Sequence, residues 1–393
     1  MKILLVHNTY QQAGGEDVVF QQEKQNLQRA GHYVATYERS NHEIEQFSAL
    51  QRAMLITRIV WNSDSRQEFA QLLARESPDL VHVHNTFIMV SPSIYSACRD
   101  QGVPVVQTLQ NYRLMCPGAL FFREGKVCEE CVEHSLWRGI RHGCYRDSPV
   151  QTAGVALMLA WHRQLKTYHE LVDCSVAATE FSRGKFVAAG FDADKIVVKP
   201  NFVDRDPGPR ERAGDYAVFA GRLSPEKGVA TLLEAWGQVH PDIPLKIVGD
   251  GPLRANLEAQ AKERGLRGIT FCGRLSRDET IATVKGARFQ ITPSVWYEGF
   301  PMVIVEAFAC GVPVLASRLG GMQEIVADGG TGLHFNPGDP QDLASKVEWA
   351  WNHPAELTEM GRAARRKYET DYTAEKNYSL LMQIYEQTMA TYV

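Results

Sequence analysis

The sequence lacks any long hydrophobic segment. The apolar run at residues 155–161 is far shorter than the ~20 residues that cross a bilayer as a helix. The run at residues 3–6 is followed at once by polar residues and is too short for a secretory signal. We therefore expect a cytoplasmic protein, peripheral to a membrane at most.

An excess of positive charge is also missing. Lys and Arg together number 42 against 46 Asp and Glu, which gives a formal net charge of −4. Nucleic-acid-binding proteins use a basic field to neutralise phosphates, so we expect no nucleic-acid partner. The 44% hydrophobic and 22% charged residues are typical of a folded globular protein, and a length of 393 residues predicts two domains.

Short apolar segments alternate with longer amphipathic ones, which is typical of β-α-β units with buried parallel strands. Pro and Gly residues interrupt this alternation and indicate a linker near residues 200–213. We predict an α/β fold of two doubly wound, Rossmann-like parallel-sheet domains, at residues 1–200 and 201–372, with a helix at 373–393 that packs back on the first domain. The predicted strands are residues 2–6, 33–37, 80–83, 103–109 and 172–178, then 217–220, 245–248, 269–272, 289–292 and 314–316.

A glycine-bounded segment, Gly-Arg-Leu-Ser-Pro-Glu-Lys-Gly at residues 221–228, follows the first predicted strand of the second domain. Ligands of open α/β sheets bind beyond the carboxyl ends of the strands, where helix N-termini favour anions. Arg222 and Lys227 would place two cations there, enough to offset a diphosphate. The alternative is a surface loop with two ordinary cations.

A second informative segment, residues 293–306, follows the strand predicted at 289–292 and leads into a helix. Pro301 suits the first turn of that helix. Glu298 lies before the helix and Glu306 within it, and carboxylates accept hydrogen bonds from sugar hydroxyls. Alternatively, Glu298 is an N-terminal helix charge and Glu306 is solvated. The apolar neighbours of Glu306 favour a buried acid with partners.

Two glutamates separated by seven residues, with Gly-Phe-Pro after the first, resemble the signature of retaining glycosyltransferases of the family-4 type. This family has the GT-B fold, in which two Rossmann-like domains face a cleft. The segment at 221–228, the Val-Gly-Asp-Gly-Pro turn at 248–252 and the pair Gly14-Gly15 are similar to the same family. The resemblance covers nearly the whole chain.

The resemblance implies roles for individual residues. Glu298 would hold the hydroxyls of the donor hexose, and Glu306 would bind the ribose. Arg222 and Lys227 would clamp the diphosphate, so no catalytic metal is expected. Backbone contacts to the nucleotide sugar would come from Gly15, Gly299, Phe300 and Met302.

One position departs from the family pattern. Many similar members have a histidine near the reacting sugar at the position of Gln110, which follows the strand predicted at 103–109. Glutamine binds a hydroxyl but does not exchange a proton near neutral pH. The leaving phosphate can take the proton of the acceptor, so a residue at this position does not have to exchange a proton. We therefore predict that Gln110 is a catalytic residue that acts through a hydrogen bond. The alternative is a catalytically impaired protein that binds nucleotide sugars.

We therefore predict a retaining hexosyltransferase that uses a UDP- or GDP-sugar and a glycan, lipid-linked or other glycoconjugate acceptor, in polysaccharide biosynthesis. The rival from another enzyme class is a nucleotide-sugar epimerase or nicotinamide-dependent oxidoreductase. Neither the Gly14-Gly15 loop nor the turn at 248–252 has the G-x-G-x-x-G spacing that this rival needs. A helix predicted at residues 151–168 either packs against the first domain or meets a membrane surface.

Cysteine is scarce, with eight residues in the chain, yet four lie close together in sequence. Cys116, Cys128, Cys131 and Cys144 have the spacing C-x11-C-x2-C-x12-C. A C-x2-C pair with two further cysteines in a cytosolic chain predicts a tetrahedral, structural Zn site that shapes a loop of the acceptor domain. The alternatives are a reduced hairpin with free thiols and a strained disulfide.

Overall fold

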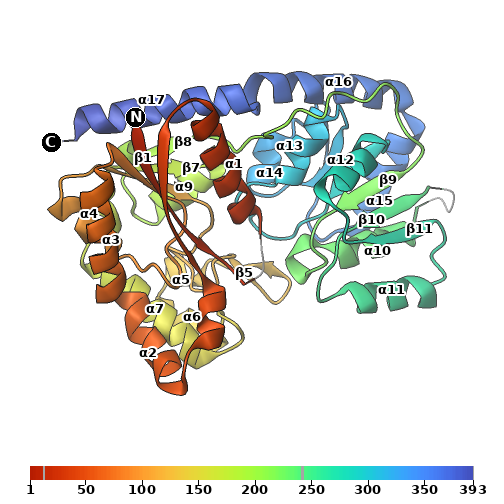
Figure 1. Cartoon of the computed structure of the whole chain (residues 1–393). Helices are drawn as coiled ribbons and strands as arrows, with labels where there is room; N and C mark the ends of the chain where they lie inside the picture. The colour runs from red at the N-terminus through yellow and green to blue at the C-terminus, as the bar shows by residue number, and fades with distance from the viewer. Residues whose placement is uncertain (12–13, 240–242, 393) are drawn as a thin grey trace. The chain divides into compact units, whose positions relative to one another are not determined.

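The computed structural model describes residues 1–11, 14–239 and 243–392, and the chain divides into two compact units (Figure 1). Unit 1 comprises Met1–Phe121, Cys128–Asn201 and Asn377–Val393, and unit 2 comprises Phe122–Val127 and Phe202–Lys376. The sequence analysis assigned residues 122–127 to the first domain, whereas in the structure they group with unit 2. Val393 lies outside the described residues.

Unit 1 contains a six-stranded sheet in the order β2-β1-β3-β4-β7-β8, and every neighbouring pair is parallel (Figure 1). Leu4 and Val6 of β1 pack into one hydrophobic cluster, and Ile3 and Leu5 pack into another. Because both faces of the sheet are buried, its strands are apolar throughout. The strands are β1 (Lys2–Thr9), β2 (Tyr33–Ser40), β3 (Leu80–Val83), β4 (Val105–Leu109), β7 (Cys174–Ala177) and β8 (Ile196–Val198).

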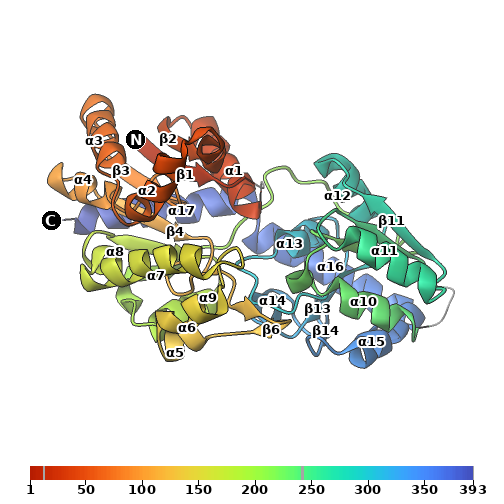
Figure 2. The same ribbon diagram turned by 90° about the horizontal axis from the view of Figure 1, so that it is seen from below.

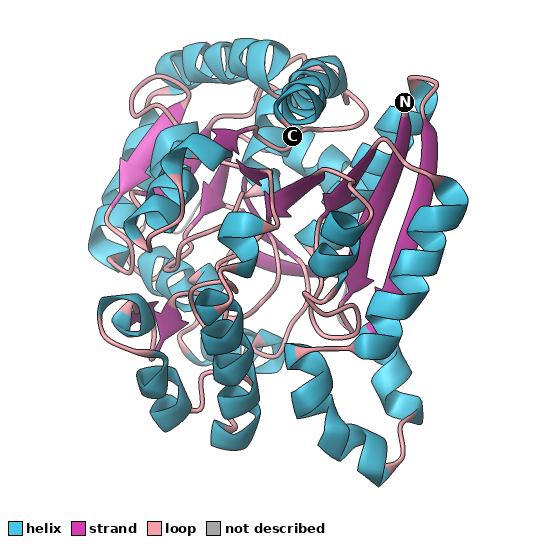
Figure 3. Cartoon of the chain, turned by 90° about the vertical axis from the view of Figure 1, so that its left-hand side faces the viewer, coloured by secondary structure: helices cyan, strands magenta, loops and turns pink. Residues whose placement is uncertain are grey.

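Three helices of unit 1 pack on one another: α2 (Ala49–Val60), α6 (Leu136–His142) and α7 (Pro149–Gln164), with α7 between the other two (Figure 2). The sequence predicted one helix over 151–168. In the structure α7 ends at Gln164, because Lys166 adopts a left-handed conformation before a short helix α8 (Thr167–Glu170). Figure 3 shows helices in cyan on both sides of the magenta strands of unit 1. The remaining helices are α1 (Gly15–Arg29), η1 (Asn41–Gln46), α3 (Ser63–Glu76), α4 (Ile94–Asp100), α5 (Glu130–Glu133), α9 (Glu180–Ala188) and η2 (Ala193–Lys195).

The last helix of the chain, α17 (Ala374–Thr391), lies mostly in unit 1. Leu381 and Tyr385 are buried in the hydrophobic cluster that contains Ile3 and Leu5 of β1. At the start of the helix, the Asn377 side chain accepts a hydrogen bond from Lys199 over 3.2 Å. The C-terminal segment therefore completes the core of the N-terminal unit.

Unit 2 contains a second six-stranded parallel sheet, in the order β11-β10-β9-β12-β13-β14. Phe219 of β9 packs with Leu232 on one face, and Val218 packs with Ile304 on the other. Its strands are β9 (Ala217–Ala220), β10 (Leu245–Val248), β11 (Ile269–Gly273), β12 (Phe289–Thr292), β13 (Val314–Ser317) and β14 (Gly332–Phe335), with a separate antiparallel pair, β5 (Phe122–Arg123) and β6 (Lys126–Val127). Its helices are η3 (Pro225–Lys227), α10 (Val229–Trp236), α11 (Arg254–Glu263), α12 (Arg277–Lys285), α13 (Met302–Ala309), α14 (Gly321–Ile325), α15 (Pro340–Asn352) and α16 (Pro354–Asp371).

All ten strands predicted from the sequence are present, whereas β5, β6, β8 and β14 were not predicted. None of the helices in the described part of the chain is long and apolar enough to cross a membrane.

Candidate functional site

Three loops meet at the carboxyl ends of neighbouring strands in unit 2. The first, residues 221–228, follows β9. At its end Gly228 has a φ of +67°, and a Cβ on this residue would lie 1.9 Å from the carbonyl oxygen of Pro293. Glycine is therefore required for the close approach of this loop to the one that follows β12. The amide of Val295 donates to the carbonyl of Glu226 over 2.9 Å and ties the two loops together.

The loop after β10 contains two further glycines in close contact with the first loop. A Cβ on Gly249 would lie 1.8 Å from the carbonyl oxygen of Gly221, and one on Gly251 would lie 2.4 Å from that of Leu223. The amide of Leu223 donates to the carbonyl of Asp250 over 3.0 Å. These glycines bring the backbones together at the edge where open α/β sheets bind ligands.

Glu298 and Lys227 form an ion pair at this edge, although they are 71 positions apart. The Lys227 ammonium lies 2.7 Å from Oε1 and 2.9 Å from Oε2 of the carboxylate. The Ser294 hydroxyl donates to Oε1 over 2.6 Å. Glu298 is only 5% exposed, whereas a quarter of the Lys227 side chain is accessible. A buried carboxylate is thus held in a fixed position by a cation that a ligand can reach.

Glu306 lies within α13 and has a different partner. Its Oε1 is 3.7 Å from Nη2 of Arg277, the first residue of α12. Burial raises the pKa of Glu306 above its ordinary value, and the charge of Arg277 partly offsets this rise. Glu306 is therefore a partly enclosed acid with a cationic neighbour, as the apolar sequence around it suggested.

The other predicted donor residues of unit 2 lie on the same loops. Arg222 is exposed on the loop after β9. Gly299 and Phe300 precede α13, and Met302 is its first residue. The Phe300 ring lies 6.1 Å from that of Tyr372, so its side chain packs into unit 2. The first amides of a helix lack partners within the helix, which makes the start of α13 suited to an anion.

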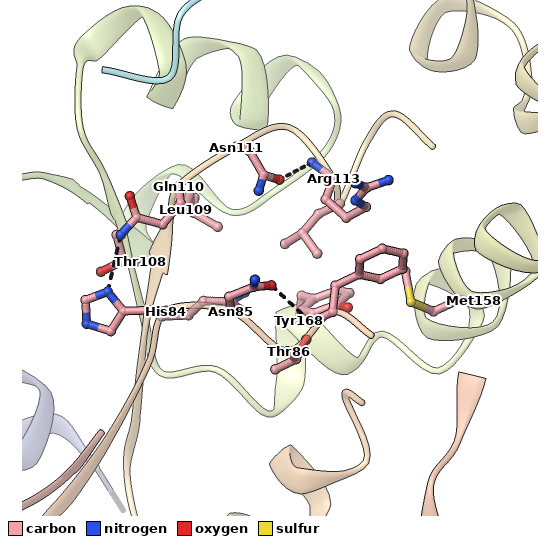
Figure 4. Close-up of a pocket in the computed structure, with 13 residues that line it drawn as sticks. His84, Asn85, Thr86, Thr108, Leu109, Gln110, Asn111, Arg113, Met158 and Tyr168 are labelled. Carbon is pink, nitrogen blue, oxygen red and sulfur yellow. Dashed lines mark hydrogen bonds between the residues drawn. The ribbon is translucent and has the colours of Figure 1, made fainter. Parts of the chain in front are cut away.

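Unit 1 has a pocket at the ends of β3 and β4 (Figure 4). Gln110 lines it, and its Nε2 donates to Nδ1 of His84 over 3.2 Å. The neutral His84 ring then carries its proton on Nε2, which is 3.8 Å from Oε2 of Glu23. Burial lowers the pKa of His84 well below its usual range, so the ring stays neutral and keeps accepting from Gln110. Other lining residues include Asn85, Thr86, Thr108, Asn111, Arg113 and Met158.

A buried polar network extends from this pocket into unit 1, and the sequence analysis did not find it. The two ring nitrogens of His82 lie 2.7 Å from the hydroxyls of Tyr385 and Thr108. Glu23 Oε1 lies 3.4 Å from the Lys199 ammonium. These residues come from β3, β4, α1, α17 and the segment after β8. No local spacing in the sequence connects them.

Glu23, His82 and His84 bring one potential metal ligand each to within 4.8 Å of one another. The arrangement does not fit a cation, because hydroxyl groups occupy both nitrogens of His82. The charge of Glu23 is also already balanced by Lys199. We interpret the cluster as a structural network that holds Gln110.

Gly15, the predicted contact in the N-terminal unit, is the first residue of α1. The preceding amide of Gly14 donates to the Asp17 carboxylate over 2.8 Å, and Asp17 also lies 2.7 Å from Nε2 of His7. A Cβ on Gly15 would meet no atom of the described residues within 4 Å. The backbone at Gly15 is therefore not crowded, and the first turn of α1 already contains the carboxylates of Glu16 and Asp17.

The four cysteines of the predicted metal site lie near one another in unit 1, and none of the four forms a disulfide. A Cβ on Gly118 would lie 3.6 Å from Cβ of Cys144 and 3.8 Å from Sγ of Cys116, and one on Gly139 would lie 3.1 Å from Sγ of Cys131. Burial, together with the other three thiols, raises the pKa of Cys131 to about 12. The disulfide alternative is thus not the arrangement in the structure.

Two family models match consecutive parts of the chain. The model described as Glycosyltransferase Family 4 matches residues 13–207, and the one described as Glycosyl transferases group 1 matches residues 203–367. The chain belongs to the family-4, group 1 glycosyltransferases. The family predicted from the sequence is confirmed.

Named relatives of the chain are glycosyltransferases too. The chain is 35% identical over 168 residues to the D-rhamnosyltransferase WbpZ of Pseudomonas aeruginosa, covering 42% of this chain and 44% of the relative. It is 29% identical over 317 residues to the glycogen synthase of Mycobacterium tuberculosis, covering 78% of this chain and 68% of the relative. The matches span about half the length of the first curated relatives.

Solved structures show the same fold. The crystal structure of Anabaena HepE in complex with UDP has a TM-score of 0.73 at 18% identity, covering 98% of this chain and 100% of that one. Sucrose-phosphate synthase of Thermosynechococcus elongatus has a TM-score of 0.74 at 20% identity, covering 99% of each chain. The predicted GT-B fold with two Rossmann-like parallel-sheet domains is therefore confirmed.

Proposed function

We propose that this protein is a retaining glycosyltransferase that moves a hexose from a UDP- or GDP-sugar to a glycan, lipid-linked or other glycoconjugate acceptor. The observation that carries the proposal is the pairing of Lys227 with buried Glu298 where three glycine-containing loops meet. A carboxylate fixed beside a cation and a helix N-terminus suits a ligand with both hydroxyls and a diphosphate. The UDP complex of Anabaena HepE, which shares the fold, agrees with such a donor.

In this proposal the donor binds to the loops of unit 2. The diphosphate competes with Glu298 for Lys227 and also pairs with Arg222, while the first amides of α13 donate to its oxygens. Glu298, still held by Ser294, then accepts hydrogen bonds from the hexose hydroxyls. Glu306 accepts hydrogen bonds from the ribose. Side-chain cations and a helix end neutralise the phosphates in this scheme, so the chemistry needs no catalytic metal.

The proposed transfer step places little demand on a protein base. The bond between the anomeric carbon of the hexose and the diphosphate oxygen breaks, and the oxygen of the acceptor hydroxyl bonds to that carbon from the same face. The departing phosphate takes the proton of the acceptor hydroxyl. Arg222 and Lys227 stabilise the negative charge that develops on the departing nucleoside diphosphate. Gln110 contributes a hydrogen bond only. Its Nε2 donates one hydrogen bond to His84, and its Oε1 accepts from a substrate hydroxyl in this scheme.

The test begins with a thermal-shift panel of UDP- and GDP-hexoses on the purified chain, followed by turnover with the donor that stabilises it. We expect slow release of nucleoside diphosphate, and nuclear magnetic resonance should show that the released sugar keeps its anomeric configuration. An inverted product would contradict retention. Stabilisation without any turnover, with and without glycan acceptors, would favour the impaired nucleotide-sugar-binding protein.

We also propose that Cys116, Cys128, Cys131 and Cys144 hold one structural zinc ion. The segment between β4 and α7 contains only two-residue strands and helices of four and seven residues, which form little core of their own. Tetrahedral thiolate ligation stabilises such irregular segments. Gly139 fits this role, because a Cβ there would lie 3.1 Å from Sγ of Cys131, and a Cβ at Gly118 would lie 3.1 Å from the carbonyl oxygen of Cys144.

Elemental analysis of protein made without added metal tests the zinc proposal. We expect about one zinc per chain, its loss in Cys128→Ser and Cys131→Ser, and a lower melting temperature after chelation. Cys272→Ser, on β11 of unit 2, is the matched control and should keep the metal. Substoichiometric metal together with four titratable thiols in the cluster would contradict the proposal.

A further inference from the structure

Large exposed apolar side chains are concentrated on α2, α6 and α7 of unit 1. Of the ten such side chains in the described part of the chain, eight lie on these helices or one residue beyond their ends. Leu157 and Trp161 of α7 are 51% and 49% exposed, and a spacing of four residues puts them on one face. We call these eight residues the apolar surface: Leu50, Met54, Trp61, Trp137, Val150, Leu157, Trp161 and Leu165.

The apolar surface lies opposite the buried faces of its helices. On α7, Val155 and Met158 are buried in a cluster that also contains Ile59 of α2. The exposed Leu50 and Met54 of α2 lie on the other side of that helix from Ile59. Because α7 packs against both α2 and α6, the three helices that carry these side chains lie next to one another (Figure 2). A group of exposed apolar side chains on neighbouring helices indicates an interaction site.

The charge on these helices has a single sign. None of the three contains Asp or Glu. Arg58 pairs with Asp64 beyond the end of α2, over 3.1 Å. Arg138 and Arg141 of α6 and Lys166 after α7 are exposed. The apolar surface is therefore accompanied by cations on the same elements.

This combination favours an anionic lipid surface over a second copy of the chain. A symmetric dimer would bring the same cations face to face across its interface, which is unfavourable. Interfacial helices instead combine Trp and Leu on one side with Lys and Arg that reach lipid phosphates. We propose that the apolar surface binds the anionic face of a bilayer, with α2, α6 and α7 lying in its plane. This docking function is independent of the transferase activity.

Vesicle flotation of the purified full chain tests the proposal. We expect it to float with vesicles of phosphatidylcholine mixed with phosphatidylglycerol, less with phosphatidylcholine alone, and less as salt is added. Trp161→Glu and Leu157→Glu should each lower the partition coefficient roughly tenfold, because a charge replaces an inserted apolar group. Arg141→Glu should weaken binding to anionic vesicles alone.

Val18→Glu is the matched control, because Val18 is 44% exposed on α1, outside the three helices, and should leave flotation unchanged. Melting temperatures of all variants establish that they fold. The proposal is overturned if the wild-type chain does not float with anionic vesicles, or if Trp161→Glu floats as well as wild type. A lipid-free dimer that Trp161→Glu dissociates, with no vesicle binding, would assign the surface to a second copy instead.

Discussion

Glu298 precedes α13 and Glu306 lies within it, and the surroundings of the two acids differ. Glu298 is bonded to Lys227 and Ser294, whereas Glu306 lies beside Arg277 with a raised pKa. A group that contacts the reacting hexose stabilises mainly the transition state. A group that binds the ribose stabilises the bound substrate and the transition state alike. Substitutions at the two positions should therefore have different kinetic consequences.

We expect Glu298→Gln to depress turnover by at least roughly a hundredfold while free nucleoside diphosphate, which has no hexose, still binds. Glu306→Gln should weaken the binding of the nucleoside diphosphate by about 1.5–3 kcal/mol. Turnover with the matched donor and calorimetric affinity for its nucleoside diphosphate provide the measurement. Full turnover in the first variant, or wild-type affinity in the second, would show that the two acids are wrongly assigned.

Arg222 and Lys227 should differ as well, because Lys227 has a role in the ligand-free chain. Replacing either with Ala should weaken nucleoside diphosphate binding by about 1.5–3 kcal/mol. Lys227→Ala should also lower folding stability, since it leaves the buried Glu298 without its cation, and Glu298→Gln in the same chain should restore part of that loss. Calorimetry and urea unfolding separate the two effects. Equal stability of Lys227→Ala and wild type would contradict the structural role of the pair.

Among whole elements, the loop after β9 depends on Gly228 for its close approach to the loop after β12. Gly228→Ala would place a methyl group against the carbonyl of Pro293, on a residue with a positive φ. We therefore expect the free energy of unfolding to fall by at least about 3 kcal/mol and the nucleotide to bind more weakly. Gly265, after α11, has a φ of +64° with open space around it, and Gly265→Ala should cost only about 1 kcal/mol. Urea unfolding of both variants measures the difference. Equal losses would mean that the contact with Pro293 is unimportant.

The elements themselves were largely predictable from the sequence, because apolar strands between helices follow local rules. The strand β8 was missed because it has only three residues, and β14 because Gly332 and His334 interrupt its apolar pattern. The loops with Arg222, Lys227 and Glu298 were found from their glycines and spacing. The pairing of Lys227 with Glu298, and the contact of His84 with Gln110, depend on tertiary folding that no local pattern encodes.

At the scale of the whole molecule, the N-terminal part of the chain and its C-terminal helix belong to the same compact unit. α17 brings Tyr385 to His82 of β3 and Asn377 to Lys199, after the chain has passed through unit 2. Burial, together with the nearby charge of Lys199, lowers the pKa of His82 to about 3. Protonation of this ring is therefore unfavourable while α17 is in place, and unit 1 should be sensitive to acid.

The direction in which folding stability changes with pH follows from proton linkage. The unfolded chain takes up a proton on His82 below its ordinary pKa of about 6.5, whereas the folded chain does not until about pH 3, so stability falls as the pH drops through this window. Each such histidine contributes a slope of up to about 1.4 kcal/mol per pH unit. Chemical unfolding from about pH 7.5 to about pH 5 should therefore show a shallower pH dependence in His82→Gln than in wild type. An unchanged slope in His82→Gln would show that His82 is not neutral in the folded chain.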